Sequence, residues 1–353
     1  MKNAKYGFID FLKDDGMEYE RAILFRVKLG DFPKFAFHIS FLLDFPLRHL
    51  NMKKLIGSLV FIFALFLLVA AYSFSNLILS PSSLVSIDVR EKLSETTFSE
   101  FALPEPEAIR FQNGTLRLRG WYFKHSKKQN CGVILLHGLG KSRNQMMPYA
   151  PIFWRQGCSL FLYDARAHGE SDGSSTTYGF YEKMDLERAV EYFSEIDNIP
   201  EDRIGIFGLD FGGATALQYA DGQFEFGFII ADSSYRDMRS WIEDMFVNQF
   251  TEASRIVTPL SLSISELRGD FLVNDVSPAN TAKLITQPVL ILAPSENETK
   301  KTDSEMIFTN IKTKSKQIVL YAMPKEDSKP LQSPSNEYET SITNFFKEFR
   351  LNK

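Results

Sequence analysis

Histidine is scarce in this chain, and the C-terminal half has none. The 353 residues contain five histidines. They are His38, His49, His125, His137 and His168. The imidazole ring is the side chain best suited to take up and return a proton near neutral pH. A general base of the usual kind is therefore excluded from every position after His168.

The chain also lacks an excess of positive charge and the common cofactor motifs. Its 40 Lys and Arg residues stand against 44 Asp and Glu residues, a formal net charge of -4, which gives no sign of a nucleic-acid partner. The sequence contains no metal-ligand cluster or phosphate-binding loop, and GLDFGG at Gly208–Gly213 lacks the G-x-G-x-x-G spacing of dinucleotide-binding proteins. We expect no nucleic acid, no metal and no cofactor.

Charged residues are missing altogether between Leu55 and Ile87. The first part of this stretch, Leu55–Tyr72, is almost wholly apolar, and about 20 apolar residues cross a bilayer. Lys53 and Lys54 precede it, and no basic residue follows before Arg90. The positive-inside rule then keeps the N-terminus in the cytoplasm. This pattern predicts a single-pass membrane protein whose C-terminal domain lies outside the cytoplasm.

A cleaved signal peptide is the alternative to an anchor. MKKLIGS from Met52 and the small residues of VAAYSFS are typical of a signal sequence, so a secreted protein stays open. Residues 1–51 are then a cytoplasmic tail or sequence upstream of a true start at Met52. We expect four segments, namely the tail at 1–51, a membrane or signal segment at 52–80, a linker at 81–107, and a globular domain at 108–353.

The chain has only two cysteines, Cys131 and Cys158. Each precedes a strand-end residue, His137 or Asp164, by the same number of positions, so parallel neighbouring strands would place both thiols at one level of a sheet. Adjacent parallel strands rarely offer disulfide geometry, and two small buried thiols are therefore the favoured expectation. A disulfide is the alternative for an exported protein.

Buried strands alternate with helices through the rest of the chain. Residues 108–123 read as two alternating strands around Asn113-Gly114, a strong hairpin signal. Six continuous apolar runs predict strands buried on both faces: CGVILLHG, SLFLYD, RIGIFG, FGFIIADSS, PVLILAP and KQIVLYA. Helical spacing appears at about 145–156, at 181–196 and in the closing NEYETSITNFFKEF. The pattern predicts an α/β fold with a doubly wound, mostly parallel sheet, and the stretch at about 234–287 predicts a small helical cap.

Motifs from Phe111 to Phe349 resemble those of the α/β-hydrolase superfamily, in particular its membrane-anchored or secreted serine lipases, esterases and peptidases. LRLRGWYF is similar to the opening strand of that family, and VILLHGLGKSR to its His-Gly oxyanion loop. YDARAHGESDG is similar to its D-x-R-G-H-G-x-S-x-G segment, with Ala167 in place of the first glycine. IGIFGLDFGGATAL is similar to the nucleophile elbow, a strand–turn–helix unit. SPANTAKLITQPVLILAPSEN resembles the run into the acid-bearing strand.

The resemblance implies roles for particular residues. The backbone N–H groups of Leu139 and Phe211 would form the oxyanion hole, which binds the negative oxygen of an acyl-transfer intermediate. We expect Arg166 to pack and hydrogen-bond within its own loop. The motif positions with a structural role are His137, Gly138, Arg166, His168, Gly208 and Gly212.

The three catalytic positions of the family are substituted. Asp210 stands where a nucleophilic serine is usual, and Asn297, nine residues after Pro288, stands where an Asp is usual. The family's histidine follows the last strand, and here that position falls near Glu326 and Asp327. Nucleophile, base and acid act together in this chemistry, so the usual triad is absent.

Two functions are compatible with these substitutions. The first is a catalytically impaired relative of the serine hydrolases with a binding or scaffolding role, and with a pocket for a small apolar or ester-like ligand. The alternative is a hydrolase of esters, alkyl halides or epoxides with Asp210 as the nucleophile, because Asp210 resembles the elbow Asp of haloalkane dehalogenases and epoxide hydrolases. Those enzymes also need a histidine after the last strand. His137 and His168 are the two candidates to replace that base.

Overall fold

The computed structural model describes residues 52–80, 98–126, 130–322 and 334–349. The tail at 1–51, most of the linker at 81–107, and Glu326 with Asp327 lie outside the described residues. The chain divides into two compact units, residues 1–64 and 65–353.

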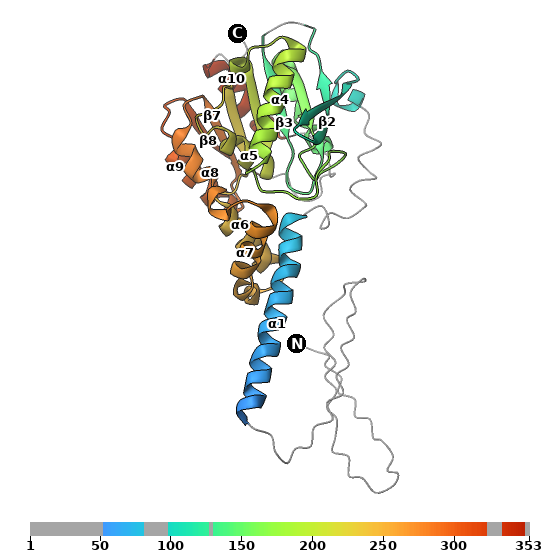
Figure 1. Cartoon of the computed structure of the whole chain (residues 1–353). Coiled ribbons are helices and arrows are strands. Elements are labelled where there is room, and N and C mark those ends of the chain that lie inside the picture. The colour runs from blue at the N-terminus through green and yellow to red at the C-terminus, as the bar shows by residue number, and fades with distance from the viewer. Residues whose placement is uncertain (1–51, 81–97, 127–129, 323–333, 350–353) are drawn as a thin grey trace. The chain divides into compact units, whose positions relative to one another are not determined.

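One eight-stranded sheet forms the centre of the larger unit (Figure 1). The strands lie in the order β1-β2-β4-β3-β5-β6-β7-β8. Their bounds are Glu107–Asn113 (β1), Leu116–Phe123 (β2), Gly132–Leu136 (β3), Ser159–Tyr163 (β4), Ile204–Leu209 (β5), Phe228–Asp232 (β6), Val289–Pro294 (β7) and Lys316–Tyr321 (β8). Strands β1 and β2 form the antiparallel hairpin, β2 pairs antiparallel with β4, and the remaining pairs are parallel. The predicted fold class is confirmed.

Helices cover both faces of the sheet because successive side chains of a strand point to opposite sides. Ile134 of β3 packs into one core cluster with residues of α4, α5 and α9, and Val133 packs into a second cluster with residues of α3 and α10. The helices are α3 (Ala150–Arg155), α4 (Glu182–Asp197), α5 (Phe211–Tyr219), α9 (Glu298–Asn310) and α10 (Asn336–Phe349). The sheet therefore lies between two apolar layers, and the β5–α5 turn follows the end of one of its central strands.

The helix expected at about 145–156 is shorter than its sequence pattern. A 3-10 turn, η4, covers Arg143–Met146, and α3 begins only at Ala150. Pro148 lies between them. Proline has no backbone N–H to donate and clashes with the preceding turn of a helix, which accounts for the break.

Two longer helices and one short helix lie between β6 and β7, in the stretch predicted to form the cap. They are α6 (Met238–Gln249), α7 (Thr258–Gly269) and α8 (Pro278–Thr281). Short 3-10 turns accompany them at Glu252–Ile256 (η6), Val273–Asp275 (η7) and Ala282–Leu284 (η8). Asp237 caps α6 by accepting a hydrogen bond from the backbone of Ser240.

The apolar N-terminal segment forms a single helix, α1, over Met52–Leu79. By length and composition it is the one helix of the described residues able to cross a membrane. Its last residues, Ile78 and Leu79, are buried in a cluster with cap residues. The Tyr178 hydroxyl donates a hydrogen bond to Ile78 O over 2.8 Å, and Thr176 N donates to Leu79 O over 2.9 Å. The end of α1 is therefore bonded to the loop that precedes α4.

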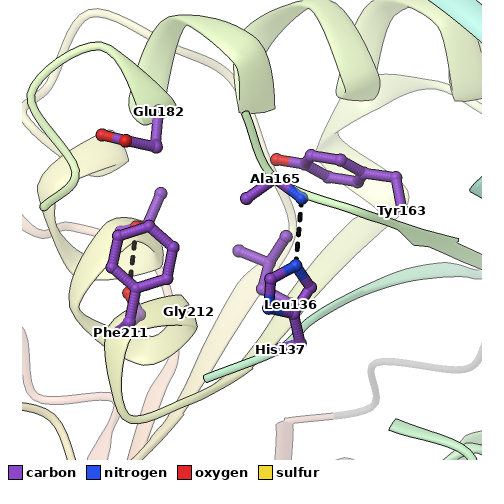
Figure 2. A pocket seen from close by; sticks show the side chains of 8 residues that line it. Leu136, His137, Tyr163, Ala165, Glu182, Phe211 and Gly212 are labelled. Atoms are coloured by element: carbon purple, nitrogen blue, oxygen red, sulfur yellow. Dashed lines mark hydrogen bonds between the residues drawn. The ribbon is translucent and has the colours of Figure 1, made fainter. Parts of the chain in front are cut away.

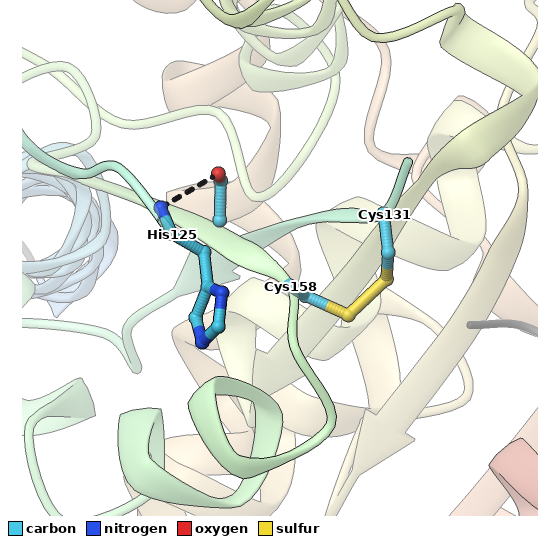
Figure 3. Close-up of a disulfide and its surroundings, with 4 residues drawn as sticks. His125, Cys131 and Cys158 are labelled. Carbon is cyan, nitrogen blue, oxygen red and sulfur yellow. Dashed lines mark hydrogen bonds between the residues drawn. A yellow bond between two sulfur atoms is a disulfide. The ribbon is translucent and has the colours of Figure 1, made fainter. Parts of the chain in front are cut away.

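Cys131 and Cys158 form a disulfide, with Cα atoms 4.6 Å apart (Figure 3). The favoured expectation of two free thiols is wrong. Both cysteines lie one position before the first residues of β3 and β4, so they sit outside the regular ladder that disfavours such bonds. Ser159 N still donates to Cys131 O over 2.9 Å, which brings the two strand starts together.

Candidate functional site

Asp210 lies at a sharp turn between β5 and α5. Its backbone has φ 50° and ψ −109°, a conformation that side-chain-bearing residues rarely adopt. The flanking glycines allow the close approach that the turn requires. A Cβ atom at Gly212 would lie 2.4 Å from Leu136 O, and one at Gly208 would lie 2.3 Å from Gly212 C. The GLDFGG motif therefore forms the backbone of a nucleophile elbow.

The carboxylate of Asp210 forms an ion pair with Lys300. The Lys300 ammonium group also donates a hydrogen bond of 2.8 Å to Ser233 O, at the end of β6. Both side chains of the pair are only partly exposed. The group that faces the nucleophile position is therefore a lysine from the first turn of α9, and the sequence interpretation did not include it. The only signal for it was its place just after the loop that follows β7.

Asn297 serves as the N-cap of α9. Its side-chain oxygen accepts a hydrogen bond from Lys300 N over 3.0 Å, as N-cap residues commonly do. The amide group at the expected acid position therefore holds the first turn of the helix that carries Lys300. It connects to Asp210 through Lys300 and not through an imidazole.

Both histidines near the elbow use their two ring nitrogens on backbone groups. His137 Nε2 lies 3.0 Å from Ala165 N, and its Nδ1 lies 2.8 Å from Gly138 O. His168 Nε2 lies 3.0 Å from Gly140 N, and its Nδ1 lies 2.8 Å from Arg166 O. Each ring therefore accepts from one N–H group and donates to one carbonyl, as a neutral imidazole does.

Burial also favours the neutral form of both rings. It lowers the pKa of His137 to about 3 and also lowers the pKa of His168, because the charged ring loses its hydration in the interior. A proton shuttle at neutral pH needs a ring that can hold and release a proton there. Both rings instead hold the loops after β3 and β4 in place.

The expected oxyanion loop lies beside the elbow. A Cβ atom at Gly138 would be 3.6 Å from Asp210 Cβ, and Gly138 N donates to Gln145 Oε1 over 2.7 Å. Leu139 packs against the buried cluster that includes Met238 and Ile242 of α6. Phe211 is the first residue of α5. The structure therefore brings Gly138, the residue before Leu139, against Asp210, and it places Phe211 directly after Asp210.

Arg166 does not bond only within its own loop, as the sequence interpretation expected. Its guanidinium group reaches Asp185 on α4 with two hydrogen bonds of 2.6 and 2.7 Å. It also contacts Tyr181 O at 3.3 Å. Asp185 is buried, and a buried carboxylate needs a charged partner. The structure therefore assigns Arg166 to fixing the loop after β4 onto α4.

Asp232, at the end of β6, is a second buried carboxylate near the elbow. It accepts hydrogen bonds from Tyr338 Oη at 2.7 Å, Tyr321 Oη at 3.0 Å and Ser233 Oγ at 2.8 Å. Its backbone oxygen accepts from Asp210 N over 2.8 Å. Burial raises the pKa of Asp232 to about 6, although its hydroxyl donors act in the opposite direction. Asp232 therefore joins the elbow to the C-terminal helix α10.

Figure 2 shows a small cavity on the inner side of the elbow, with His137, Phe211 and Glu182 among its lining residues. Its volume is about 10 Å³, which is about the space of one water molecule. This cavity is too small for the small apolar or ester-like ligand expected from the sequence. Within the described parts of the chain, no group of three or more His, Cys, Asp or Glu side chains could hold a metal ion.

Comparison with known proteins agrees with this fold. A family model for the alpha/beta hydrolase fold matches residues 133–222. An esterase of Pyrococcus furiosus superposes with a TM-score of 0.56 at 20% sequence identity, over 72% of this chain and 96% of that one. At that identity, the likeness concerns the fold alone.

Several curated proteins match by sequence, and two of them are described here. The uncharacterized protein YqkD of Bacillus subtilis is 28% identical over 213 residues, which are 60% of this chain and 67% of YqkD. The protein bem46 of Schizosaccharomyces pombe is 24% identical over 168 residues, 47% of this chain and 51% of its own length. Together with the sheet order and the turn at Asp210, these matches show that the chain has the α/β-hydrolase fold.

Proposed function

We propose that this chain is a membrane-anchored α/β-hydrolase-fold protein that does not turn over esters and acts by binding or scaffolding. The ion pair between Asp210 and Lys300 carries this proposal. Acyl transfer requires a nucleophile activated by a base and donors that receive a developing negative charge. A carboxylate already paired with an ammonium group offers neither.

The missing base supports the same proposal. The chain has no histidine after His168, and both His137 and His168 are bonded to backbone groups at each ring nitrogen. Attack by the Asp210 carboxylate on an ester would give an anhydride and an alkoxide leaving group that needs a proton. Within the described residues, neither of the two imidazoles near the elbow is free to supply that proton.

The experiment measures hydrolysis of short acyl esters by the full chain in detergent micelles, beside labelling by a fluorophosphonate, which requires an activated serine. We expect the esters to be hydrolysed no faster than in buffer alone, and we expect no fluorophosphonate label at the elbow. The Asp210→Ala variant is the matched control, since it removes the carboxylate and keeps the turn. Turnover well above the buffer rate that disappears in Asp210→Ala would overturn the proposal.

A second candidate is a hydrolase with Asp210 as nucleophile, and the strained backbone at φ 50° favours it, because this conformation presents the side chain at a nucleophile position. With an alkyl halide, an Asp210 oxygen would bond to the carbon while the halide ion leaves. Water must then cleave the resulting ester. We expect at most one halide ion per chain and an alkyl adduct on the Asp210 peptide. Repeated halide release would establish the second candidate.

The proposal includes a topology, with α1 in the membrane and residues 98–349 outside the cytoplasm. The disulfide between Cys131 and Cys158 supports it, because disulfides persist in oxidising compartments and are rare in the cytoplasm. Reporters that work only inside or only outside the cytoplasm, fused after Lys353, test it. We expect signal from the outside reporter, and signal from the inside reporter alone would contradict this topology.

A further inference from the structure

The end of α1 packs along the cap helix α7. Ser265 Oγ donates to Ser75 Oγ over 3.0 Å, and Arg268 Nη1 donates to the same oxygen over 3.1 Å. The Arg268 guanidinium group also lies 4.7 Å from the ring centre of Tyr72, a cation–π contact. The two helices are therefore joined by polar contacts in addition to apolar packing.

The contacts show that α1 and α7 run in the same direction. Ser265 meets Ser75, and Gly269, four residues further along α7, lies against Leu79, four residues further along α1. A helix rises about 1.5 Å per residue. Thr258, at the start of α7, therefore lies about 10 Å before Ser265 and roughly level with Leu68.

The facing sides of the two helices consist of small residues. Ala71 and Ser75 of α1 are fully buried, and so are Thr258, Ser261 and Ser265 along one side of α7. Small residues at four-residue spacing let helices approach closely, and this packing is common between helices in membranes. The packing is thus of the kind expected where α7 lies at membrane level.

The outer side of α7 carries two exposed leucines, with the exposed Ser263 between them. Leu260 is 41% exposed and Leu267 is 86% exposed, and Ile256, one turn before α7, is 70% exposed. No charged residue occurs from Thr258 to Ser265. The charged side chains just before α7, Glu252 and Arg255, bond to each other over 2.7 Å. These two charges lie near the deeper end of α7, and charged side chains at membrane level pair with one another in this way.

We propose that α7 lies in the headgroup and upper acyl region of the bilayer that holds α1, with Leu260, Leu267 and Ile256 facing lipid. The exposed apolar side chains of α1 at the same level, Leu68 and Val69, continue this surface. Because α7 runs alongside α1, it enters this layer with Thr258 deepest, and it does not lie in the plane of the interface as many amphipathic helices do. The inference rests on the proposed anchoring by α1 and adds that the cap itself contacts the membrane.

The experiment places spin labels on single introduced cysteines in the full chain, reconstituted in phosphatidylcholine vesicles. The native cysteines are joined in a disulfide and do not take up the label. Labels at Leu260→Cys and Leu267→Cys are compared for collision with oxygen, which concentrates in lipid, and with a water-soluble nickel chelate. We expect both labels to favour oxygen, and Leu260→Cys to do so several-fold more strongly, because it lies deeper.

Two further labels make the result decisive. Met306→Cys on α9 is the matched control, since Met306 is 45% exposed on the body of the domain and should favour the nickel reagent. Phe66→Cys reports anchoring by α1. A lipid signal at Phe66→Cys with a water signal at Leu260→Cys overturns the inference alone, while water at both overturns the anchoring itself. Leu260→Cys shielded from both reagents means a protein partner covers α7, and this also overturns the inference.

Discussion

Lys300 and Asp210, 90 residues apart in the chain, form an ion pair at the tip of the elbow between β5 and α5. The lysine approaches from the first turn of α9, and Asn297 fixes that turn as its cap. The carboxylate at this position is thus paired with a group from the β7–α9 unit, two strands away from β5 in the sheet. The strength of this ion pair can therefore be measured from the free energy of unfolding, in addition to any measurement of activity.

The first prediction concerns the strength of this pair. The two side chains are 23% and 30% exposed, so the coupling should lie between that of exposed and buried pairs, at about 1–2 kcal/mol. A double-mutant cycle of Lys300→Met and Asp210→Asn, followed by urea unfolding, measures it. The neighbouring Lys301–Glu298 pair, at 3.8 Å, is the matched control and should show much weaker coupling. Equal coupling in both cycles would contradict the prediction.

The second prediction concerns backbone strain at Asp210. Its φ of 50° and ψ of −109° suit glycine better than any residue with a Cβ atom. In the Lys300→Met background, Asp210→Gly should therefore unfold with a free energy about 1–2 kcal/mol higher than Asp210→Ala. Urea unfolding of the two variants compares them directly. An alanine variant as stable as the glycine variant would show that the turn is not strained.

The third prediction concerns Asp232 and pH. Its pKa is raised to about 6 by burial, so the folded state binds its proton more tightly than the unfolded state, whose carboxyl has a pKa of about 4. The Asp232 contribution to the free energy of unfolding therefore falls as pH rises from about 4 to about 6. Asp232→Asn does not titrate, and its stability relative to the unmodified chain should rise across that window.

Tyr338→Phe provides the complementary test for Asp232. It removes the hydroxyl that donates to the carboxylate over 2.7 Å, and such a donor favours the charged form. The substitution should therefore cost more stability at pH 7 than at pH 4, as measured by urea unfolding at both values. A cost that does not change with pH would mean that Asp232 keeps one protonation state throughout.

The fourth prediction concerns the disulfide. Cys131 and Cys158 are 27 positions apart, and closing a loop of this size should stabilise the fold by about 3–4 kcal/mol in the chain-entropy account. Reductant should lower the urea midpoint of the unmodified chain. It should leave unchanged the midpoint of the Cys131→Ala/Cys158→Ala double variant, which should already match the reduced chain. No effect of reductant on the unmodified chain would contradict the prediction.

The sequence predicts the sheet and the elbow because both depend on local patterns. Continuous apolar runs mark strands buried on two faces, and the glycines at 208 and 212 are required where backbone approaches backbone. The closing helix is also local, and α10 covers the predicted NEYETSITNFFKEF. Each of these features can be recognised without knowing which segments meet in space.

The ion pair could not be predicted in the same way. Lys300 lies among polar residues at the start of an exposed helix, where lysine is common, and only the fold brings it to Asp210. Two of the three hydroxyl donors to Asp232, Tyr321 of β8 and Tyr338 of α10, are likewise far away in sequence. The sequence does not favour the disulfide, because it does not show that both cysteines precede their strands.

The hydrogen bond from Tyr178 to the end of α1 has a mechanical consequence. Tyr178 O accepts hydrogen bonds of 2.8 Å from Gln218 on α5 and from the Tyr235 hydroxyl, while its own hydroxyl holds Ile78 O. A force that pulls α1 away from the domain must therefore strain Tyr178 and, through it, α5. Because α5 begins at the residue after Asp210, tension on α1 reaches the helix that follows the elbow, by a route separate from the covalent linker.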